Sequence, residues 1–319
     1  MDLARLHGIF VPIVTPLTPD ERVDHASLRR LIDFLIDGGV HGIWVMGTTG
    51  EFAAFPEDER ARAIETTVDR VAGRVAVVAN VGDSSTGLAL RHARHAAAAG
   101  ADALALTPPH YYPHSMDEML AHFRTVKQAY PDLPLLVYNI PQTVKVKMTV
   151  ATTLQLATEG TAQGIKDSQN DLRWFRQLAM GARTAGLAHD FRLFLGTRAL
   201  IDAGAVISAH GAIPATANVA PTACAEAWDA AVRGDFATAA QAQELVIEFE
   251  DLALLARGGS AEAAGYSAMK HTLREWGIIE HATLTRPLRE FSVEELGELR
   301  RRLAALRRGN RPLAAATPA

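Results

Sequence analysis

Lys166 is the side chain of this sequence whose position most strongly suggests covalent chemistry. It follows Gly164 and Ile165 at the end of a short apolar run, where removing an amine from water is costly. In one interpretation the amine reaches solvent or pairs with the adjacent Asp167. In the other it is held away from water, is neutral for part of the time, and attacks a carbonyl carbon to form an imine.

Tyr138 ends another apolar run earlier in the chain. A tyrosine at the end of a strand commonly packs its ring into a core and leaves its hydroxyl in water. If the strand of Tyr138 lies beside that of Lys166, the phenol can instead carry protons to and from a carbinolamine. The two residues are therefore a candidate pair for imine chemistry.

A glycine-rich turn, GTTGE at residues 47–51, follows a third apolar run. Turns of this kind follow many strands, so the composition alone is not specific. The successive N–H groups of the turn can form a nest for a carboxylate, while the threonine hydroxyls orient neighbouring groups. We therefore take Thr48, Thr49 and Gly50 as candidates for substrate binding.

A second loop, PPHYYP at residues 108–113, carries aromatic and imidazole groups. Tyr111 and Tyr112 could contact a substrate, but exposed tyrosines are equally typical of a subunit interface. His110 and His114 flank the two tyrosines and are further candidates for substrate contact.

No motif in the sequence indicates a metal or a nucleotide cofactor. The patterns G-x-x-x-x-G-K-[ST], G-x-G-x-x-G and H-E-x-x-H are all absent. His92 and His95 lie three residues apart on an expected helix with no carboxylate on that face, so we interpret them as surface histidines. The single cysteine, Cys224, can form neither an internal disulfide nor a cysteine-based zinc site. We expect neither a metal nor a cofactor.

The composition is that of a globular protein without a nucleic-acid or membrane signal. Of 319 residues, 48% are hydrophobic and 21% charged, which argues against disordered and fibrous classes. The 32 Lys and Arg against 36 Asp and Glu leave a net charge of −4, so there is no basic footprint for DNA or RNA. No apolar run is long enough for a spanning helix. We expect a cytoplasmic protein that binds neither nucleic acid nor membrane.

Eight short apolar runs alternate with longer amphipathic stretches up to about residue 232. Their apolar residues occupy consecutive positions, as in parallel strands that are buried on both faces. The runs span residues 8–14, 42–46, 75–81, 103–107, 135–139, 163–166, 191–195 and 205–209. Eight strand–helix units predict an α/β fold of the (β/α)8 TIM-barrel type, although an open doubly wound sheet has the same periodicity. In a barrel, loops at the carboxyl ends of the strands meet on one rim and form the functional site.

Only helices are predicted beyond the barrel. Apolar spacing indicates helices over residues 237–255, 261–276 and 293–306. We therefore divide the chain into a catalytic barrel (1–232), a C-terminal helical extension (233–306) and a flexible tail (307–319).

The motifs taken together resemble the dihydrodipicolinate synthase and N-acetylneuraminate lyase family of class I aldolases and lyases. The combination is specific, whereas no single motif is. It consists of GTTGE at 47–51, YNIP at 138–141 and GIKDS at 164–168, with Thr15-Pro16 near the start and ANVAP at 217–221. The resemblance extends over about residues 7–305 and implies a (β/α)8 barrel.

The resemblance implies a role for each of these residues. Lys166 would form an imine with the keto carbon of pyruvate or another 2-oxo acid. Thr48 and Thr49 would hold the carboxylate, mainly through their N–H groups. Tyr138, Thr48 and Tyr111 would form a proton relay, with Tyr111 reaching in from a neighbouring subunit.

Assembly and the remaining site contacts are also implied by the resemblance. Ile213 would offer backbone polar groups near the imine. Members of the family are commonly homotetramers built as dimers of dimers, and the imine itself serves as the electron sink, so no metal is needed.

The sequence departs from the family pattern where the second substrate would bind. In the synthase an arginine follows the tyrosine by five positions and grips a semialdehyde carboxylate, whereas Thr143 stands there in this chain. The lyase usually has acidic residues after the glycine of strand 7, and here Thr197 and Arg198 take their place. Arg198, Lys145 and Lys147 leave room for a second anionic group, which suggests a hydroxy-oxo diacid or a sugar acid.

The leading prediction is an aldolase or lyase that cleaves or condenses a 2-oxo acid, with pyruvate as the imine partner of Lys166. A dehydratase or hydratase that uses the same imine to eliminate or add water is the nearest alternative. A non-catalytic barrel that binds a small 2-oxo acid is the alternative from another class. The lysine, tyrosine and threonine set argues against it, because a pure binder has little need of a desolvated amine.

Overall fold

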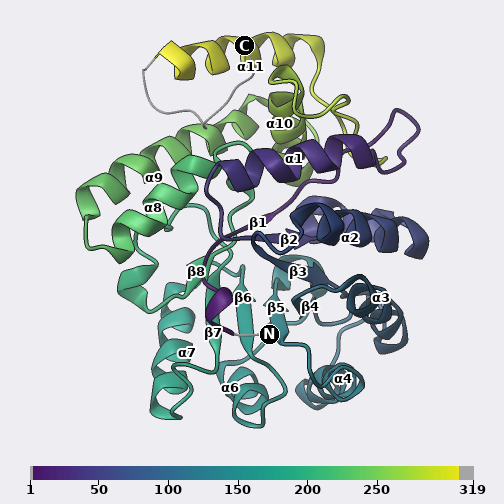
Figure 1. The fold of residues 1–319 in the computed structure, drawn as a ribbon, viewed down its shortest axis with the longest axis vertical. Coiled ribbons are helices and arrows are strands. Elements are labelled where there is room, and N and C mark those ends of the chain that lie inside the picture. Colours follow the sequence, from purple (N-terminus) through teal and green to yellow (C-terminus); the bar gives the residue numbers. More distant parts are fainter. Residues whose placement is uncertain (1–2, 309–319) are drawn as a thin grey trace.

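Eight parallel strands close on themselves to form a barrel in this structure, a computed structural model that describes residues 3–308 (Figure 1). Each strand pairs with the next along the chain, and β8 pairs with β1. The strands are β1 (Gly8–Pro12), β2 (Gly42–Val45), β3 (Ala76–Asn80), β4 (Ala103–Leu106), β5 (Leu135–Asn139), β6 (Gly164–Asp167), β7 (Arg192–Leu195) and β8 (Gly211–Ala212). The predicted (β/α)8 fold is confirmed, and the open sheet is excluded.

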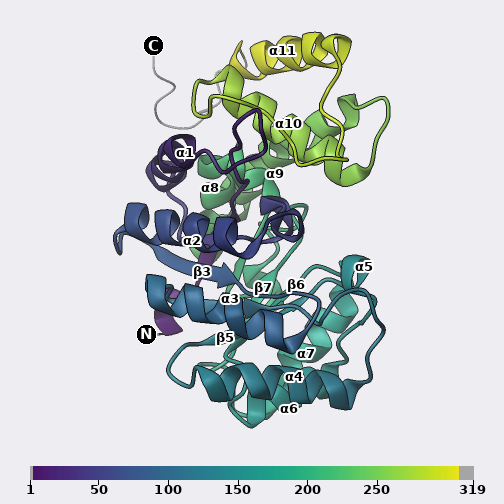
Figure 2. The ribbon, with the colours of Figure 1, turned by 90° about the vertical axis from the view of Figure 1, so that its right-hand side faces the viewer.

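Helices surround the barrel and cover its outer face (Figures 1 and 2). Those that follow the strands are α1 (His25–Asp37), α2 (Glu57–Val71), α3 (Thr86–Ala99), α4 (Met116–Ala129), α5 (Pro141–Val144), α6 (Val150–Thr158), α7 (Leu172–Thr184) and α8 (Pro221–Val232). The N-terminus of α4 is closed by a capping box, in which the Ser115 hydroxyl accepts from the N–H of Glu118 and the Glu118 carboxylate accepts from the N–H of Ser115.

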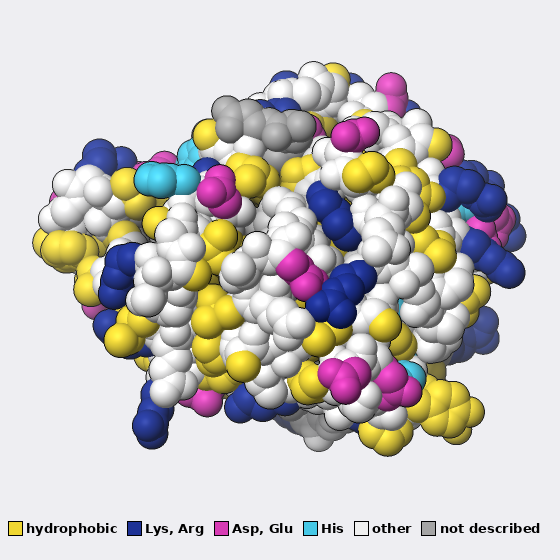
Figure 3. Space-filling view, turned by 90° about the horizontal axis from the view of Figure 1, so that it is seen from below, with side chains coloured by type: hydrophobic (Ala, Val, Ile, Leu, Met, Phe, Trp, Pro, Cys, Tyr) yellow, Lys and Arg dark blue, Asp and Glu magenta, His cyan; other side chains and the backbone are white. Residues whose placement is uncertain are grey.

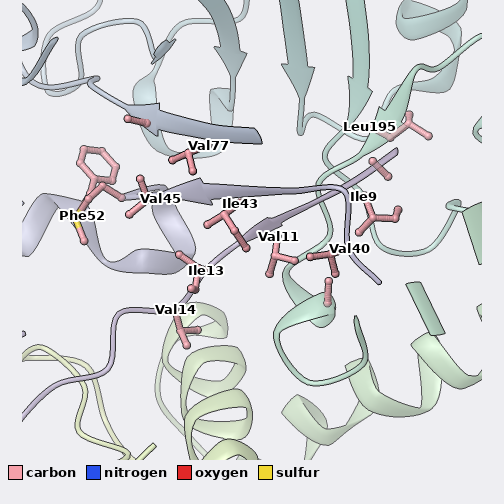
Figure 4. Close-up of a cluster of buried hydrophobic side chains, with 14 of the residues drawn as sticks. Ile9, Val11, Ile13, Val14, Val40, Ile43, Val45, Phe52, Val77 and Leu195 are labelled. Atoms are coloured by element: carbon pink, nitrogen blue, oxygen red, sulfur yellow. The ribbon is translucent and has the colours of Figure 1, made fainter. Parts of the chain in front are cut away.

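Side-chain parity along the strands separates two apolar layers. Successive residues of a strand point to opposite faces, so one set fills the barrel and the other meets the helices. The outer set on the first strands is visible in Figure 4, where Ile9, Val11 and Ile43 pack side by side. The inner set includes Phe10, Trp44, Ala76, Ala103, Leu136, Tyr138 and Phe194. The same parity places the side chain of Lys166 inside the barrel, because it lies in register with Tyr138.

The last strand was predicted in the wrong place. The apolar run 205–209 contains a 3-10 helix, Ala205–Ile207, and β8 is the two-residue segment Gly211–Ala212 that follows it. The glycine is needed because β8 approaches β1 very closely: a Cβ on Gly211 would lie 2.1 Å from the carbonyl oxygen of Gly8. A strand this short and glycine-rich has too few apolar residues to produce a periodic signal.

The extension after α8 is helical, as predicted. It consists of α9 (Phe236–Glu250), a 3-10 helix (Asp251–Leu255), α10 (Ala261–Glu275) and α11 (Val293–Arg308). The helix expected over 237–255 is therefore α-helical only to Glu250. Figure 2 shows α10 and α11 at the same end of the molecule as α1, beyond the barrel. The division into barrel and extension stays a prediction, as does the tail, of which residues 309–319 lie outside the described part.

No helix within residues 3–308 is both long and apolar enough to span a membrane. The face that carries α4, α6 and α7 is seen in Figure 3, where charged side chains of both signs are dispersed among apolar ones.

Candidate active site

The side chain of Lys166 lies inside the mouth of the barrel and is only 4% exposed. Its Nζ is 3.2 Å from the hydroxyl oxygen of Tyr138, the residue beside it on β5. The same nitrogen lies 4.2 Å from the centre of the Tyr138 ring and 5.1 Å from that of Trp44. The amine is therefore held against a phenol between two aromatic rings.

Asp167 is not the partner of this amine. Its Oδ1 accepts a hydrogen bond of 2.7 Å from the side-chain amide of Asn139, the residue in register with it. Burial raises the pKa of the Asp167 carboxyl to about 6. The interpretation in which Lys166 reaches bulk water or pairs with Asp167 is wrong, because adjacent residues of β6 face opposite sides of the barrel wall.

Tyr138 links the lysine to the glycine-rich turn. Its side chain is 2% exposed, and its hydroxyl oxygen is 3.1 Å from Oγ1 of Thr48. The phenol therefore contacts both the amine and a threonine hydroxyl, and is not left in water as an ordinary strand-end tyrosine would be. Lys166, Tyr138 and Thr48 form a continuous hydrogen-bonded chain, which is the arrangement that proton transfer requires.

The turn after β2 is a short 3-10 helix, Thr48–Gly50. Within it the N–H groups of Gly50 and Glu51 donate to the carbonyls of Gly47 and Thr48, which leaves the N–H groups of Thr48 and Thr49 as the candidates for binding a carboxylate. Gly50 itself does not line the cleft. A Cβ there would lie 3.1 Å from the carbonyl oxygen of Ile13, so glycine allows the turn to pack against the chain that follows β1.

A cleft of about 680 Å³ opens above the lysine at the carboxyl ends of the strands. Lys166, Tyr138, Thr48, Thr49, Ile213 and Arg198 all contribute to its wall. The barrel supplies the floor, and the 3-10 helix Asp251–Leu255 together with α10 supplies part of the side. The structure thus brings together six of the eight predicted site residues around one cavity.

The charges around this cleft are mostly negative. The basic side chains in the described wall are Lys166 and Arg198, against the three carboxylates of Asp171, Glu250 and Glu262. The guanidinium of Arg198 forms an ion pair with Glu250. Lys145 and Lys147, which we expected near a second anionic group, do not line the cleft.

Tyr111 lies away from the lysine in the single chain. It is 68% exposed and its backbone has a φ of +88°, which is uncommon for a residue other than glycine. The amine of Lys145 donates to its carbonyl oxygen at 3.1 Å, and its ring packs edge-on against Tyr112. Its part in a relay across a subunit boundary stays a prediction.

The interpretation of His92 as a surface histidine is wrong, whereas His95 is partly exposed. His92 is buried, with Nε2 2.9 Å from Oδ2 of Asp83 and 2.9 Å from the guanidinium of Arg60. His95 is half-buried and lies 2.8 Å from Glu57. Both carboxylates come from other elements, so the helix pattern gave no sign of them.

Metal ligation is not supported by these histidines. No cluster of three or more His, Cys, Asp or Glu side chains suited to a metal is found in the described part of the chain. His110 and His114 also lie outside the wall of the cleft.

A model of the dihydrodipicolinate synthetase family matches residues 5–306. The chain belongs to that family. A 4-hydroxy-tetrahydrodipicolinate synthase of Phenylobacterium zucineum is 37% identical over 242 residues, which cover 75% of this chain and 79% of the relative. An uncharacterized DapA-like lyase of Halobacterium salinarum is 36% identical over 254 residues, or 79% of this chain and 80% of the relative.

Solved structures of the family share the fold closely. The prophage protein YagE from E. coli K12, solved in complex with pyruvate, superposes with a TM-score of 0.87 at 25% identity and covers 94% of this chain and 98% of its own. The dihydrodipicolinate synthase of Bacteroides thetaiotaomicron gives 0.87 at 29% identity with the same coverage. The resemblance inferred from the motifs is confirmed.

The sequence did not predict two residues of the C-terminal extension that contact the glycine-rich turn of the site. Tyr266 on α10 lines the cleft, and its hydroxyl donates to the carbonyl oxygen of Thr48 at 2.9 Å. Lys270, one turn further along α10, forms an ion pair with Glu51. The helical spacing predicted α10 itself, but no motif connects it to a turn more than 200 residues earlier in the chain.

Proposed function

We propose that this protein is a class I aldolase or lyase that forms an imine between Lys166 and pyruvate or a related 2-oxo acid. The observation that carries the proposal is the contact of 3.2 Å between a buried amine and a buried phenol at the floor of a cleft. A lysine serves as a nucleophile when it is desolvated and when a neighbouring group can exchange protons with the adduct.

Each site residue has a separate role in imine formation. The carboxylate of the 2-oxo acid binds the N–H groups of Thr48 and Thr49, and this places the keto carbon at Nζ of Lys166. A C–N bond forms as the carbonyl oxygen is protonated, and that oxygen then leaves as water. Tyr138 supplies and accepts these protons, and Thr48 passes them on.

The same imine supports bond formation or cleavage at the adjacent carbon. Loss of a proton from the methyl carbon gives an enamine, with the electron pair delocalised to nitrogen. The enamine attacks the carbonyl carbon of an aldehyde to form the new C–C bond, and water then hydrolyses the imine to free the product and Lys166. In the reverse direction the C–C bond breaks to release the aldehyde, and the remaining enamine is protonated at carbon and hydrolysed to pyruvate. Ile213 lines the cleft, and because its N–H donates to the carbonyl oxygen of Leu195, its own carbonyl oxygen is the backbone group that we propose faces the imine.

Two further parts of the proposal come from the family. YagE was solved with pyruvate, and this supports pyruvate as the imine partner here. Tyr111 is proposed to complete the relay in a neighbouring protomer of a homotetramer. Its 68% exposure in the single chain leaves it accessible to such a neighbour.

The charge of the cleft favours an uncharged partner aldehyde. Thr143 occupies the position of the family's semialdehyde-binding arginine and lines the cleft. Arg198 is paired with Glu250, so a second carboxylate would have to compete with a carboxylate already in place. Apart from Thr48, Thr49, Tyr138 and Tyr266, the uncharged polar side chains of the wall are Gln142, Thr143, Ser168, Asn170, Thr197 and Thr216. Hydroxyl and amide groups such as these bind polyols, so we favour a sugar acid over a diacid, with Arg198 donating to a substrate hydroxyl.

The test of the imine is irreversible inactivation by borohydride. Incubation with pyruvate and borohydride should inactivate the wild-type protein, whereas either reagent alone should not. Lys166→Ala should be inactive and should form no reduced adduct with pyruvate. Lys147→Ala, which changes an exposed lysine outside the cleft, should behave as wild type. Inactivation by borohydride in the absence of pyruvate would contradict the proposal.

The test of the partner is a panel of aldehydes offered together with pyruvate. Hydroxylated neutral aldehydes of three to six carbons should condense faster than aldehydes that carry a carboxylate. Preference for a carboxylated aldehyde would contradict the charge argument but leave the imine intact. Loss of water from a 3-deoxy-2-oxo acid without release of pyruvate would instead indicate a dehydratase.

A further inference from the structure

Two side chains of α10 contact the Thr48–Gly50 turn, which we propose binds the substrate carboxylate. The hydroxyl of Tyr266 donates to the carbonyl oxygen of Thr48 at 2.9 Å. The ammonium of Lys270 donates to Oε1 of Glu51, the residue that ends the turn, at 2.5 Å. Tyr266 and Lys270 are four residues apart and so lie on the same face of the helix.

The carboxylate of Glu51 is completely enclosed by donors. Its Oε2 accepts from both the N–H and the hydroxyl of Thr285, each at 2.8 Å. Lys270 also donates to the carbonyl oxygen of Thr283 at 2.8 Å. The side chains of Lys270 and Glu51 are 0% and 1% exposed. Such a pair fixes geometry tightly, because moving either charge leaves the other buried without a partner.

The backbone of the turn needs this support. Glu51 has a φ of +59° and Met46, on the other side of the turn, has a φ of +55°. Residues with a Cβ seldom adopt this left-handed region, and they persist there when surrounding contacts over-determine the conformation. The contacts from α10 are therefore placed where the turn would otherwise relax.

We infer that Tyr266 and Lys270 are positioning residues that set the Thr48–Gly50 turn for binding the substrate carboxylate and for contact with Tyr138. The inference rests on the proposed function. The path is short: Tyr266 fixes the carbonyl of Thr48, and the hydroxyl of that same residue lies 3.1 Å from the phenol that contacts Lys166. The C-terminal extension is thereby part of the catalytic apparatus without touching the reacting atoms.

The test compares a ketone that has a carboxylate with one that lacks it. Imine formation is measured by borohydride trapping at a series of pyruvate concentrations and, separately, with hydroxyacetone. Tyr266→Phe removes one oxygen and should raise the half-saturating pyruvate concentration about fivefold, the effect of one hydrogen bond. Lys270→Met should raise it by at least about tenfold, since Glu51 loses its counter-charge. Trapping of hydroxyacetone, which uses Tyr138 but not the carboxylate site, should fall by a smaller factor than trapping of pyruvate in Tyr266→Phe.

Ser267→Ala is the matched control. Ser267 is buried on α10 between the two positioning residues, and its hydroxyl accepts from the N–H of Phe291 at 2.8 Å, away from the turn. This variant should retain the wild-type response to pyruvate. Equal losses in Ser267→Ala and Tyr266→Phe would show a general effect of loosening the helix and would overturn the inference.

The outcomes separate this inference from the proposed function. If wild-type protein is not trapped by pyruvate at all, both fail. If wild type is trapped but Tyr266→Phe keeps its half-saturating pyruvate concentration, the positioning role alone fails. Because Tyr266→Phe conserves the ring and its packing, the test does not depend on whether Lys270→Met folds.

Discussion

Replacing Tyr138 by phenylalanine tests the relay with the smallest possible change. The substitution removes one oxygen that lies 3.2 Å from Nζ of Lys166 and 3.1 Å from Oγ1 of Thr48, and it keeps the ring that packs edge-on against Trp44 at 5.5 Å. The variant should therefore fold and keep an intact cleft, while the proton path between the amine and the turn is broken.

Two consequences of Tyr138→Phe can be given a size. Loss of two hydrogen bonds in the barrel mouth should lower the free energy of unfolding by about 2 kcal/mol, at about 1 kcal/mol for each bond. Loss of a positioned proton donor and acceptor should slow imine formation by about 10²- to 10⁴-fold. The kinetic effect is much larger than a 2 kcal/mol loss of folding stability would cause in a protein that remains folded.

The assay is rapid mixing of enzyme with labelled pyruvate, followed by a borohydride quench at increasing times. The initial rate reports imine formation, and its dependence on pyruvate concentration reports binding. Tyr112→Phe is the matched control, because Tyr112 is 62% exposed and lies outside the cleft wall. A rate for Tyr138→Phe within threefold of wild type, at saturating pyruvate, would refute the relay.

Three other changes test the charges of the site. Lys270→Met should lower the free energy of unfolding by about 3–5 kcal/mol because Glu51 is left as a buried unpaired charge, and adding Glu51→Gln should recover part of that loss in urea titrations. Thr143→Arg should raise kcat/KM for a carboxylated aldehyde about tenfold relative to a neutral one, since a charged hydrogen bond contributes about 1.5–3 kcal/mol. Burial raises the pKa of Asp167 from 3.8 to about 6, so the folded state holds this proton more tightly than the unfolded state. The stabilisation from protonated Asp167 is therefore complete below about pH 4. The free energy of unfolding should fall by up to about 3 kcal/mol as the pH rises from there through 6, at 1.36 kcal/mol per pKa unit. Unfolding of Asp167→Asn should lack this component, and identical pH profiles for the two proteins would contradict the assignment.

The barrel and the lysine–tyrosine pair could be predicted because both depend on local pattern. Apolar residues at consecutive positions identified seven of the eight strands near their observed places. Once the barrel is assumed, the carboxyl ends of β5 and β6 must lie side by side, and this is where Tyr138 and Lys166 stand. The eighth strand could not be placed, because Gly211–Ala212 is defined by close backbone contact and not by side chains.

The missed features depend on contacts between distant parts of the chain. The helix pattern predicts His92 at the surface because it carries no sign of its partners, Asp83 and Arg60, which come from other elements. Tyr266 was overlooked because its spacing marks it only as an apolar position of an amphipathic helix. Its contact with Thr48 follows from where the extension docks, and no local pattern encodes that docking.

The charge preference of the cleft could not be predicted from the sequence, because it depends on which carboxylates pair with its cations. The sequence gives no sign of a partner for Arg198, but in the structure it is paired with Glu250, which lies on α9. Lys147, which does not line the cleft, pairs at 3.7 Å with Asp171, which does. The cations Arg198, Lys145 and Lys147 suggest a second anionic group when only the sequence is known, whereas the pairing of Arg198 and Lys147 favours a neutral, hydroxylated partner.

The most direct measurement is the identity of the lysine that carries pyruvate carbon after reduction. Protein incubated with pyruvate and borohydride is digested, and the modified peptide is located by mass spectrometry. The account predicts a single reduced adduct on Lys166, at no more than one per chain, which is lost in Lys166→Ala. An adduct on another lysine, or full catalytic activity after Lys166 has been replaced, would contradict it.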